Sequence, residues 1–206
     1  MWALVENNNV VKVFTRPTAL TIGDVNYPQN IMSVWSSEEL EAIGIYEIVV
    51  DNSNLKDEQY YINGQESFTF ADGVVTKSFG TATAKALDDV LWAEGDADMP
   101  EGVSVGDVKI KGIRDGHKAT INAQAGSLLQ GTDWYIIREA DGGTAVPANI
   151  STWRASVRSK ANEMCTAIDG AADVDALAAL YEYTNTGTEE APVYTRPLGE
   201  FPQLGE

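Results

Sequence analysis

The sequence predicts an α+β fold, in which an antiparallel β domain precedes a helical region and an extended C-terminal arm. β-branched and aromatic runs separated by turn dipeptides fill the first half of the chain. Apolar residues at three- and four-residue steps fill much of the second half, and proline without apolar periodicity marks the end. We therefore expect a β domain with a short helix over residues 1–90, an acidic linker over 91–110, a helical region over 111–184 and an arm over 185–206.

The chain is expected to begin with a β-hairpin and to continue into a short helix. Trp2–Glu6 and Val10–Phe14 flank three asparagines, which tolerate the left-handed backbone of a tight turn. Ser36 and Glu39 have the spacing of a capping box, so a helix is expected to start there. Gly44 supplies the residue type that ends such a helix.

The rest of the β domain is predicted from two kinds of signal. Ile45–Val50 is a β-branched run and is expected to be a buried strand. Asn63-Gly64 and Asp72-Gly73 are strong hairpin dipeptides. They predict a three-stranded meander made of Tyr60–Ile62, Gln65–Phe70 and Val74–Phe79.

The second half is expected to contain four helices. Leu87 and Leu91 predict a short one over Thr83–Trp92. The others are expected to run from Ile113 or Asp115 to Leu129, from Pro147 onward, and from about Val174 to Tyr183. Proline suits the first turn of a helix, where its missing N–H has no partner in any case. The apolar stripe of the Pro147 helix is Ile150, Trp153, Val157, Ala161, Met164 and Ile168.

A corner is predicted where the first long helix ends. It consists of Leu128, Leu129, Thr132, Asp133 and Trp134. Asp133 is expected to turn the chain by accepting a backbone N–H, and Trp134 to be buried there, before a polar loop leads to Pro147. Arg154 and Arg158 lie one turn apart and form a basic ridge for Asp133, for Glu139 or for a partner. The simpler of these interpretations is an intramolecular salt bridge that frames the corner.

Residues from about Ile113 to Asp169 resemble the C-terminal segment of bacteriophage tail-fibre-associated and tail assembly chaperone-like proteins. In that family a Leu-Leu…Thr-Asp-Trp corner precedes a helix with an aromatic-Arg…Arg repeat. The matching residues are Leu128, Leu129, Thr132, Asp133, Trp134, Pro147, Trp153, Arg154 and Arg158. The family usually has Tyr where Trp153 stands, a conservative difference.

The resemblance implies a structural protein of the virion, in the tail, the baseplate or the region where tail fibres attach. Its expected partners are other tail or fibre proteins and further copies of itself, and its expected location is the virion after synthesis in the host cytoplasm. Two alternatives remain open. One is a tail-fibre assembly chaperone that is absent from the mature particle, and the other is a sugar-binding receptor module.

The charge of the chain excludes several kinds of partner. The net charge is −17, with 31 acidic and 14 basic residues. Nucleic acids and anionic membranes both require clustered Lys and Arg, so neither is an expected partner. Contacts between copies need to be apolar or locally neutral. The beginning of the chain lacks the basic segment of a secretory signal, and we expect no transmembrane helix.

Residues suited to catalysis or metal binding are scarce, so we expect a protein without enzymatic activity, cofactor or metal. His117 is the only histidine, and it is either a half-buried helix residue or a polar residue that faces symmetry-related copies. Cys165 is expected to be a small packing residue. The acidic cluster Glu94, Asp96, Asp98 and Glu101 lacks the spacing of a calcium loop. The aromatic residues that would carry the sugar-binding alternative are Trp2, Trp35, Tyr60 and Tyr61.

The C-terminal arm is expected to work by contact with a neighbouring subunit. Its composition does not supply enough apolar area to order it alone. The apolar residues isolated among Pro, Gly and Glu are Tyr194, Leu198, Phe201 and Leu204. We expect these four side chains to enter pockets on another subunit, with proline limiting the entropy lost on docking.

Overall fold

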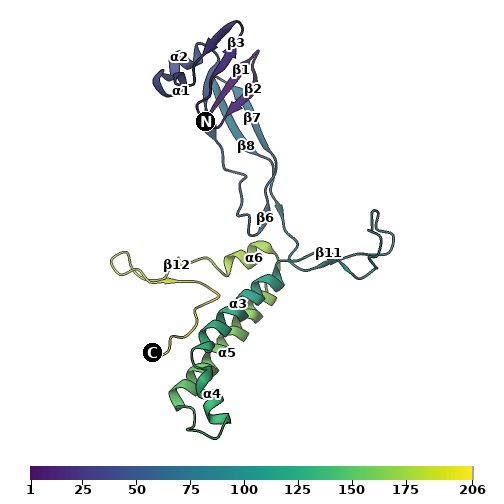
Figure 1. Cartoon of the computed structure of the whole chain (residues 1–206), viewed down its shortest axis with the longest axis vertical. Coiled ribbons are helices and arrows are strands. Elements are labelled where there is room, and N and C mark those ends of the chain that lie inside the picture. Colours follow the sequence, from purple (N-terminus) through teal and green to yellow (C-terminus); the bar gives the residue numbers. More distant parts are fainter. Residues whose placement is uncertain (206) are drawn as a thin grey trace. The chain divides into compact units, whose positions relative to one another are not determined.

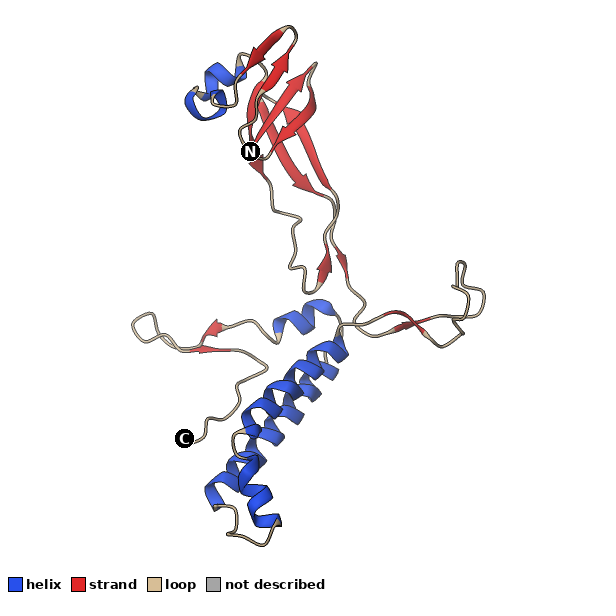
Figure 2. Ribbon diagram, viewed as in Figure 1, coloured by secondary structure: helices blue, strands red, loops and turns tan. Residues whose placement is uncertain are grey.

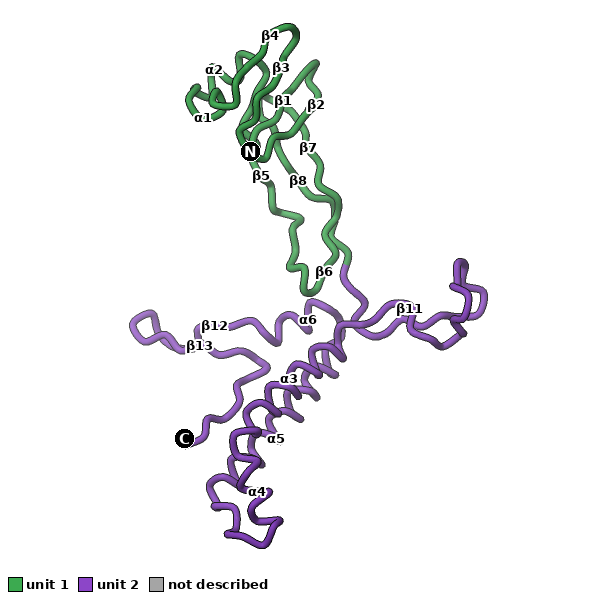
Figure 3. The backbone as a smooth tube through the Cα atoms, in the orientation of Figure 1, with its two compact units in different colours: residues 1–83 green, residues 84–206 purple. Residues whose placement is uncertain are grey.

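A computed structural model describes residues 1–205 and divides the chain into two compact units, residues 1–83 and 84–206 (Figure 3). The α+β class is confirmed, since one unit is built on a β-sheet and the other on helices (Figure 2). Within residues 1–205, none of the helices combines the length and the hydropathy that crossing a membrane requires.

Unit 1 is built on a curled sheet of five strands in the order β2-β1-β5-β8-β7. Its elements are β1 (Trp2–Glu6), β2 (Asn9–Phe14), β3 (Leu20–Ile22), β4 (Val25–Tyr27), α1 (Ile31–Val34), α2 (Ser37–Glu41), β5 (Ile45–Val50), β6 (Tyr61–Ile62), β7 (Glu66–Ala71) and β8 (Val74–Phe79), with β9 (Thr83–Ala84) at its end. The expectation of a purely antiparallel sheet is wrong, because β5 and β8 pair in parallel. After β5 the chain forms the antiparallel hairpin β7–β8, and the second strand of this hairpin, β8, lies beside β5 and runs parallel to it.

Two of the three predicted turns are confirmed. Asn7 and Asn8 have φ angles of 49° and 62°, and Asp72 and Gly73 have 51° and 78°. Two consecutive positive φ angles match the right-handed twist of the paired strands. The predicted Asn63-Gly64 hairpin is wrong, because β6 pairs with β9 and is not part of a meander. The Asn63 side chain instead accepts from the Lys56 N–H and donates to the Lys56 carbonyl.

The core of unit 1 lies between the sheet and the segment that contains α1 and α2. Its buried residues are Leu4, Phe14, Leu20, Ile31, Met32, Leu40 and Ile45. The predicted capping box is present, since the Ser36 hydroxyl accepts from the Glu39 N–H while the Glu39 carboxylate accepts from the Ser36 N–H. The β5 strand is buried only at its beginning, because Val49 and Val50 are 56% and 43% exposed.

Unit 2 is built on two long antiparallel helices, α3 and α5, which lie side by side (Figure 1). Its elements are β10 (Val90–Leu91), β11 (Val108–Ile110), α3 (Arg114–Gln130), α4 (Asp133–Ala140), α5 (Ala148–Asp169), α6 (Val174–Ala179), β12 (Thr184–Asn185) and β13 (Tyr194–Thr195). Every residue of the predicted stripe on α5 is buried except Trp153, which is half-buried. The core residues of the unit are His117, Ile121, Ala125, Ile150, Val157, Ala161, Met164, Ile168, Ala171, Val174, Leu177 and Leu198.

The helix predicted over Thr83–Trp92 is wrong, because this segment is extended. The carbonyls of Ala86 and Leu87 accept from the backbone N–H groups of Ile113 and Arg114, which begin α3. These non-local hydrogen bonds override the helical spacing of the two leucines, since local propensity is a weak prior.

The acidic segment expected to be a linker forms an ordered two-stranded ribbon. β10 and β11 pair antiparallel, and Trp92 exchanges backbone hydrogen bonds with the opposite strand. The Lys109 ammonium lies 4.4 Å from the centre of the Trp92 ring and 3.0 Å from the Asp96 carboxylate. The hydrogen bond from the Ala93 N–H, together with that from Lys109, lowers the pKa of Asp96.

Candidate functional site

The predicted corner between α3 and α5 is a helix of two turns, α4, and the predicted polar loop follows it before α5 begins. We define the tip as residues 131–158, which comprise α4, the loop after it and the first turns of α5. None of the side chains of α4 is buried. A helix gains most of its stability from packing an apolar face, so another contact must fix the position of α4.

Arg154 is the side chain that fixes α4. One of its terminal nitrogens donates to the Leu129 carbonyl at 2.9 Å and to the Thr132 hydroxyl at 2.6 Å, and the other lies 2.8 Å from the Asp133 carboxylate. The Arg154 side chain is only 11% exposed and Thr132 is 5% exposed. The predicted salt bridge to Asp133 is therefore present, and it clamps the junction of α3 and α4.

The other predicted arginine plays no part in this clamp. Arg158 is exposed and has no ion-pair partner among residues 1–205, and Glu139 is not used by either arginine. Replacement of Arg154 by alanine is expected to lower the free energy of unfolding by about 1–3 kcal/mol, because a buried hydroxyl and a carbonyl lose their charged donor. The Arg158→Ala variant is the matched control and is expected to unfold like the parent in urea titrations. Equal stability of all three proteins would contradict the clamp.

The prediction that Trp134 is buried is wrong, because its side chain is 51% exposed. α4 turns Trp134 outward, together with Ile136 and Ile137, which are 43% and 62% exposed. The cost of about 3–5 kcal/mol that truncation of a core aromatic carries therefore does not apply to Trp134.

The exposed aromatic residues of the tip form a stack with an arginine. The ring centres of Trp134 and Tyr135 are 3.8 Å apart, and the Arg138 guanidinium lies 4.9 Å and 5.2 Å from them. The Arg138 Nε also donates to the Thr144 carbonyl in the loop after α4. This stack limits the rotamers of all three side chains without covering the apolar surface of α4.

The remaining residues of the predicted unit are Leu128, Leu129, Pro147 and Trp153, whose side chains take no part in the Arg154 clamp. Leu128 is 37% exposed, Leu129 is half-buried, and Pro147 immediately precedes α5. Trp153 is not part of the clamp, because its indole N–H donates to the Pro202 carbonyl of the C-terminal segment at 2.9 Å.

The prediction that all four anchors of the arm dock on another subunit is wrong for Leu198. Leu198 is 2% exposed in its own chain, and its N–H donates to the Leu180 carbonyl. Nearby, Arg196 forms an ion pair with Glu200 at 2.8 Å. Tyr194 and Leu204 are 64% and 49% exposed, so contact of these two with a partner stays a prediction.

Phe201 is half-buried and lines a groove of about 710 Å³ between α3 and the C-terminal segment. The walls of the groove are Thr120, Ala123, Gln124, Ser127, Leu128, Arg196, Glu200, Phe201 and Gln203. The groove is wide open, and its two charged groups, Arg196 and Glu200, neutralise each other. Ligand sites are typically concave with a few convergent polar groups, and this groove supplies no such set.

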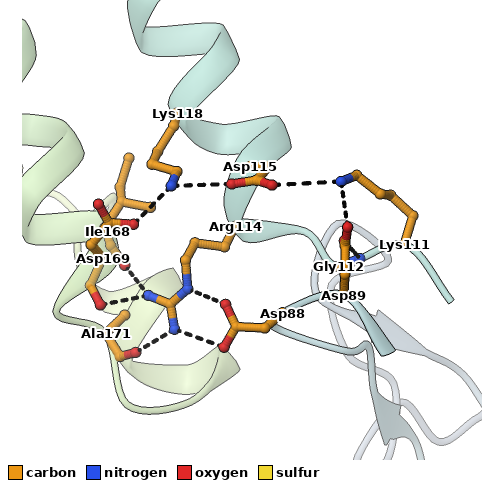
Figure 4. A network of polar contacts seen from close by, with 10 residues as sticks. All are labelled: Asp88, Asp89, Lys111, Gly112, Arg114, Asp115, Lys118, Ile168, Asp169 and Ala171. Atoms are coloured by element: carbon orange, nitrogen blue, oxygen red, sulfur yellow. Dashed lines mark hydrogen bonds and ion pairs between the residues drawn. The ribbon is translucent and has the colours of Figure 1, made fainter. Parts of the chain in front are cut away.

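A polar network that the sequence did not predict lies at the opposite end of α3 from the tip (Figure 4). The Arg114 guanidinium donates to the carbonyls of Ile168, Asp169 and Ala171 at 2.5 Å, 2.8 Å and 3.0 Å. It also forms a two-pronged contact with the Asp88 carboxylate. Arg114 thus satisfies the last carbonyls of α5 and holds the base of the β10–β11 ribbon.

The second strand of the ribbon is held at the same place. The Asp89 carboxylate accepts from the Lys111 ammonium at 2.7 Å and from the Gly112 N–H at 2.8 Å, and these bonds lower the pKa of Asp89. A Cβ added to Gly112 would lie 2.7 Å from the Asp88 Cα. The two strands therefore approach so closely at Gly112 that no side chain fits between them.

The only histidine and the only cysteine belong to the helix pair. His117 is 9% exposed, its Nδ1 lies 2.9 Å from the Tyr181 hydroxyl, and burial lowers its pKa. His117 therefore packs within its own unit. The alternative expectation, that it faces symmetry-related copies of the chain, is wrong. Burial raises the pKa of the Cys165 thiol, which suits the predicted packing role and not that of a nucleophile.

The weaker candidate sites do not assemble. Among residues 1–205, no group of three or more His, Cys, Asp or Glu side chains is placed to hold a metal ion. Of the aromatic residues considered for sugar binding, Tyr60 is 6% exposed, which removes it from any binding surface. Trp35 is 36% exposed and packs edge-on against Tyr27.

The tip combines exposed apolar side chains, a stacked arginine and a clamp that fixes the helix carrying them. Tryptophan and arginine are the residue types that contribute most to protein–protein contacts when they lie on an ordered surface. No protein-family model, curated protein or solved structure matches this chain.

Proposed function

We propose that this protein is a non-enzymatic structural component of a bacteriophage virion, in the tail, the baseplate or the region where tail fibres attach. In this proposal the tip is a docking element for another protein of the assembly. The observation that carries the proposal is α4, a helix with no buried side chain that presents Trp134, Ile136 and Ile137 to solvent. The resemblance of residues 113–169 to phage tail proteins supplies the biological setting.

The clamp supports a docking role by physical argument. Arg154 orders α4 before any partner is present, so less conformational entropy is lost on binding. The stack of Arg138 on Trp134 and Tyr135 orders the side chains in the same way. Charge agrees with this role, because the tip contains three arginines and three carboxylates in a chain of net charge −17. The tip is thus a neutral region where another acidic protein meets no net repulsion.

The double variant Trp134→Ala/Ile137→Ala tests this role. We expect it to unfold within about 0.5 kcal/mol of the parent, because substitutions of exposed side chains seldom change stability further. Incorporation into particles is expected to fall strongly, and mass spectrometry of purified particles measures it. Ile62→Ala is the matched control, since Ile62 is as exposed as Ile137, at 62%. Normal incorporation of the double variant would contradict docking through the tip.

A tail-fibre assembly chaperone would use the same exposed surface, because it binds a fibre protein only during folding. The particle measurement separates the two functions. A virion component is present in a fixed number of copies per particle, whereas an assembly chaperone is absent from purified particles and present in infected-cell lysates.

A further inference from the structure

The C-terminal segment, residues 184–205, folds back onto the two long helices of its own unit. After α6 the chain forms the β12–β13 hairpin and returns to α3 and α5 (Figure 1). Leu198 is buried there, its N–H donates to the Leu180 carbonyl, and the Pro202 carbonyl accepts from the Trp153 indole. Most other residues of the segment are exposed. A peripheral segment of this kind opens at a lower cost in free energy than the helix pair beneath it.

Tyr181 connects this segment to His117 of α3. The His117 Nδ1 lies 2.9 Å from the Tyr181 hydroxyl, and the centres of the two rings are 5.1 Å apart. From the segment, the Arg196 guanidinium lies 6.0 Å from the centre of the Tyr181 ring. Arg196 is held in turn by the Glu200 carboxylate, which also accepts from the Tyr183 hydroxyl. The contact between Tyr181 and His117 therefore depends on the segment being in place.

His117 is buried at a position where a charge is costly. It is 9% exposed, and burial lowers its pKa. The Tyr181 hydroxyl can pair with the neutral or the charged imidazole, so the loss of hydration is what disfavours the charge. The other titratable groups on the surrounding elements bind partners of their own or are exposed. They are Lys85 and Asp88 before α3, Arg114, Asp115 and Lys118 on α3, Cys165 and Asp169 on α5, Asp173 and Asp175 on α6, and Glu182 and Arg196 after α6.

We propose that protonation of His117 releases the C-terminal segment from α3 and α5, which makes the segment a latch that opens in mild acid. An imidazolium adds a second cation beside the Tyr181 ring that Arg196 already contacts. Release separates these two charges and gives water access to the imidazole. It also uncovers Leu198 and removes the acceptor of the Trp153 indole, so the helix pair gains an apolar surface for a partner. The latch goes beyond docking by the tip and does not depend on it.

The direction of the pH dependence follows from the burial of His117. In the released state water reaches the imidazole, and its pKa returns toward the ordinary value of about 6.5. The released state therefore binds a proton more readily than the docked state. As the pH falls below about 6.5, docking weakens until His117 is charged in both states. Well above that pH His117 is neutral in both states, and docking does not depend on pH through this group.

Hydrogen–deuterium exchange of the full chain and of its His117→Gln variant tests the latch. Glutamine binds no proton and can still pair with the Tyr181 hydroxyl. At any one pH the two chains share the same intrinsic exchange chemistry in residues 184–205, so the ratio of their rates reports release. Between about pH 7.5 and about pH 5.5, the ratio of parent to variant at the Leu198 and Gly199 amides is expected to rise by up to about tenfold, since one proton is bound on release. The ratio at the higher pH is the baseline if the variant is less stable.

Two controls assign the proton to His117. His117 is the only histidine, so the magnetic resonance signals of its ring follow its protonation in the unsubstituted chain. They are expected to titrate below about pH 6.5. Glu200→Gln is the matched control, because Glu200 is a carboxylate of the same network, and this chain is expected to keep the pH response.

Four outcomes would overturn the inference. The first is a ratio that stays the same at both pH values, and the second is a His117 ring that titrates at or above the ordinary value. The third is a Glu200→Gln chain without the pH response, which would assign the proton to Glu200. The fourth is an equal rise at amides in the middle of α3 and α5, because unit 2 would then unfold as a whole and not release its segment.

Discussion

Truncation of Leu198 to alanine is expected to lower the free energy of unfolding of unit 2 by about 2–4 kcal/mol, as for leucines in protein cores. Leu198 is 2% exposed, and its removal leaves a cavity in the core of that unit. Because α3 and α5 supply most of the helix, urea denaturation followed by the helical circular dichroism signal reports on unit 2. Tyr194→Ala is the control, because Tyr194 lies in the same segment and is 64% exposed.

The comparison decides where the C-terminal segment belongs. A large loss for Leu198→Ala with little change for Tyr194→Ala means that the segment is part of the core of unit 2 and that its outer face is free for a partner. Deletion of residues 184–206 is then expected to destabilise unit 2. Equal and small effects would restore the interpretation of the segment as an arm that depends on a neighbour.

Replacement of Arg114 by alanine is expected to lower the free energy of unfolding by about 2–3 kcal/mol, because two carbonyls at the end of α5 and the Ala171 carbonyl just after it lose a charged donor. The Arg114 side chain is only 13% exposed, so water does not replace it easily. The Arg114→Lys variant is expected to recover little of the lost stability. The planar guanidinium donates to several acceptors at once, and a compact ammonium cannot reach all of them.

Lys111→Ala is the matched control for Arg114. Lys111 belongs to the same network, but its side chain is 63% exposed, and exposed ion pairs add little to stability. Hydrogen exchange provides a second measurement, in which loss of Arg114 is expected to speed exchange in the ribbon and at the end of α5 together. A loss confined to either element would contradict a network that joins them.

Local signals in the sequence predicted much of the fold. The capping box at Ser36, the Asn7-Asn8 turn and the stripe on α5 were all predicted correctly, because each depends on residues within a few positions of one another. The parallel pairing of β5 with β8 and the extended form of residues 83–92 were missed. Both depend on contacts between distant segments, such as the hydrogen bond from the Arg114 N–H to the Leu87 carbonyl, and local patterns do not report these.

The candidate site was predicted only in part: the sequence pointed to Trp134 and Arg154, but not to the exposed Ile136 and Ile137 or to the stacked Arg138. The one-turn spacing of Arg154 and Arg158 predicted a basic ridge that could pair with Asp133 or Glu139, and only the Arg154–Asp133 salt bridge is present. The sequence Asp133–Ala140 has the composition of a helix as well as that of a corner, so burial of Trp134 did not follow from its residue type. The role of Arg114 carried no local signal, because its acceptors are the Asp88 carboxylate 26 residues away and three backbone carbonyls more than fifty residues away.

The close approach of the ribbon strands at Gly112 has a consequence for the evolution of this protein. Position 112 accepts no side chain, because even a methyl group would overlap the Asp88 backbone. Val108 and Ile110, only a few residues away, face solvent and bear no such restriction. Related chains are therefore expected to vary at these outer positions, as the surfaces they meet diverge, and to keep glycine at 112. A lineage can in this way change the exposed surface of the ribbon while the path of its backbone stays the same.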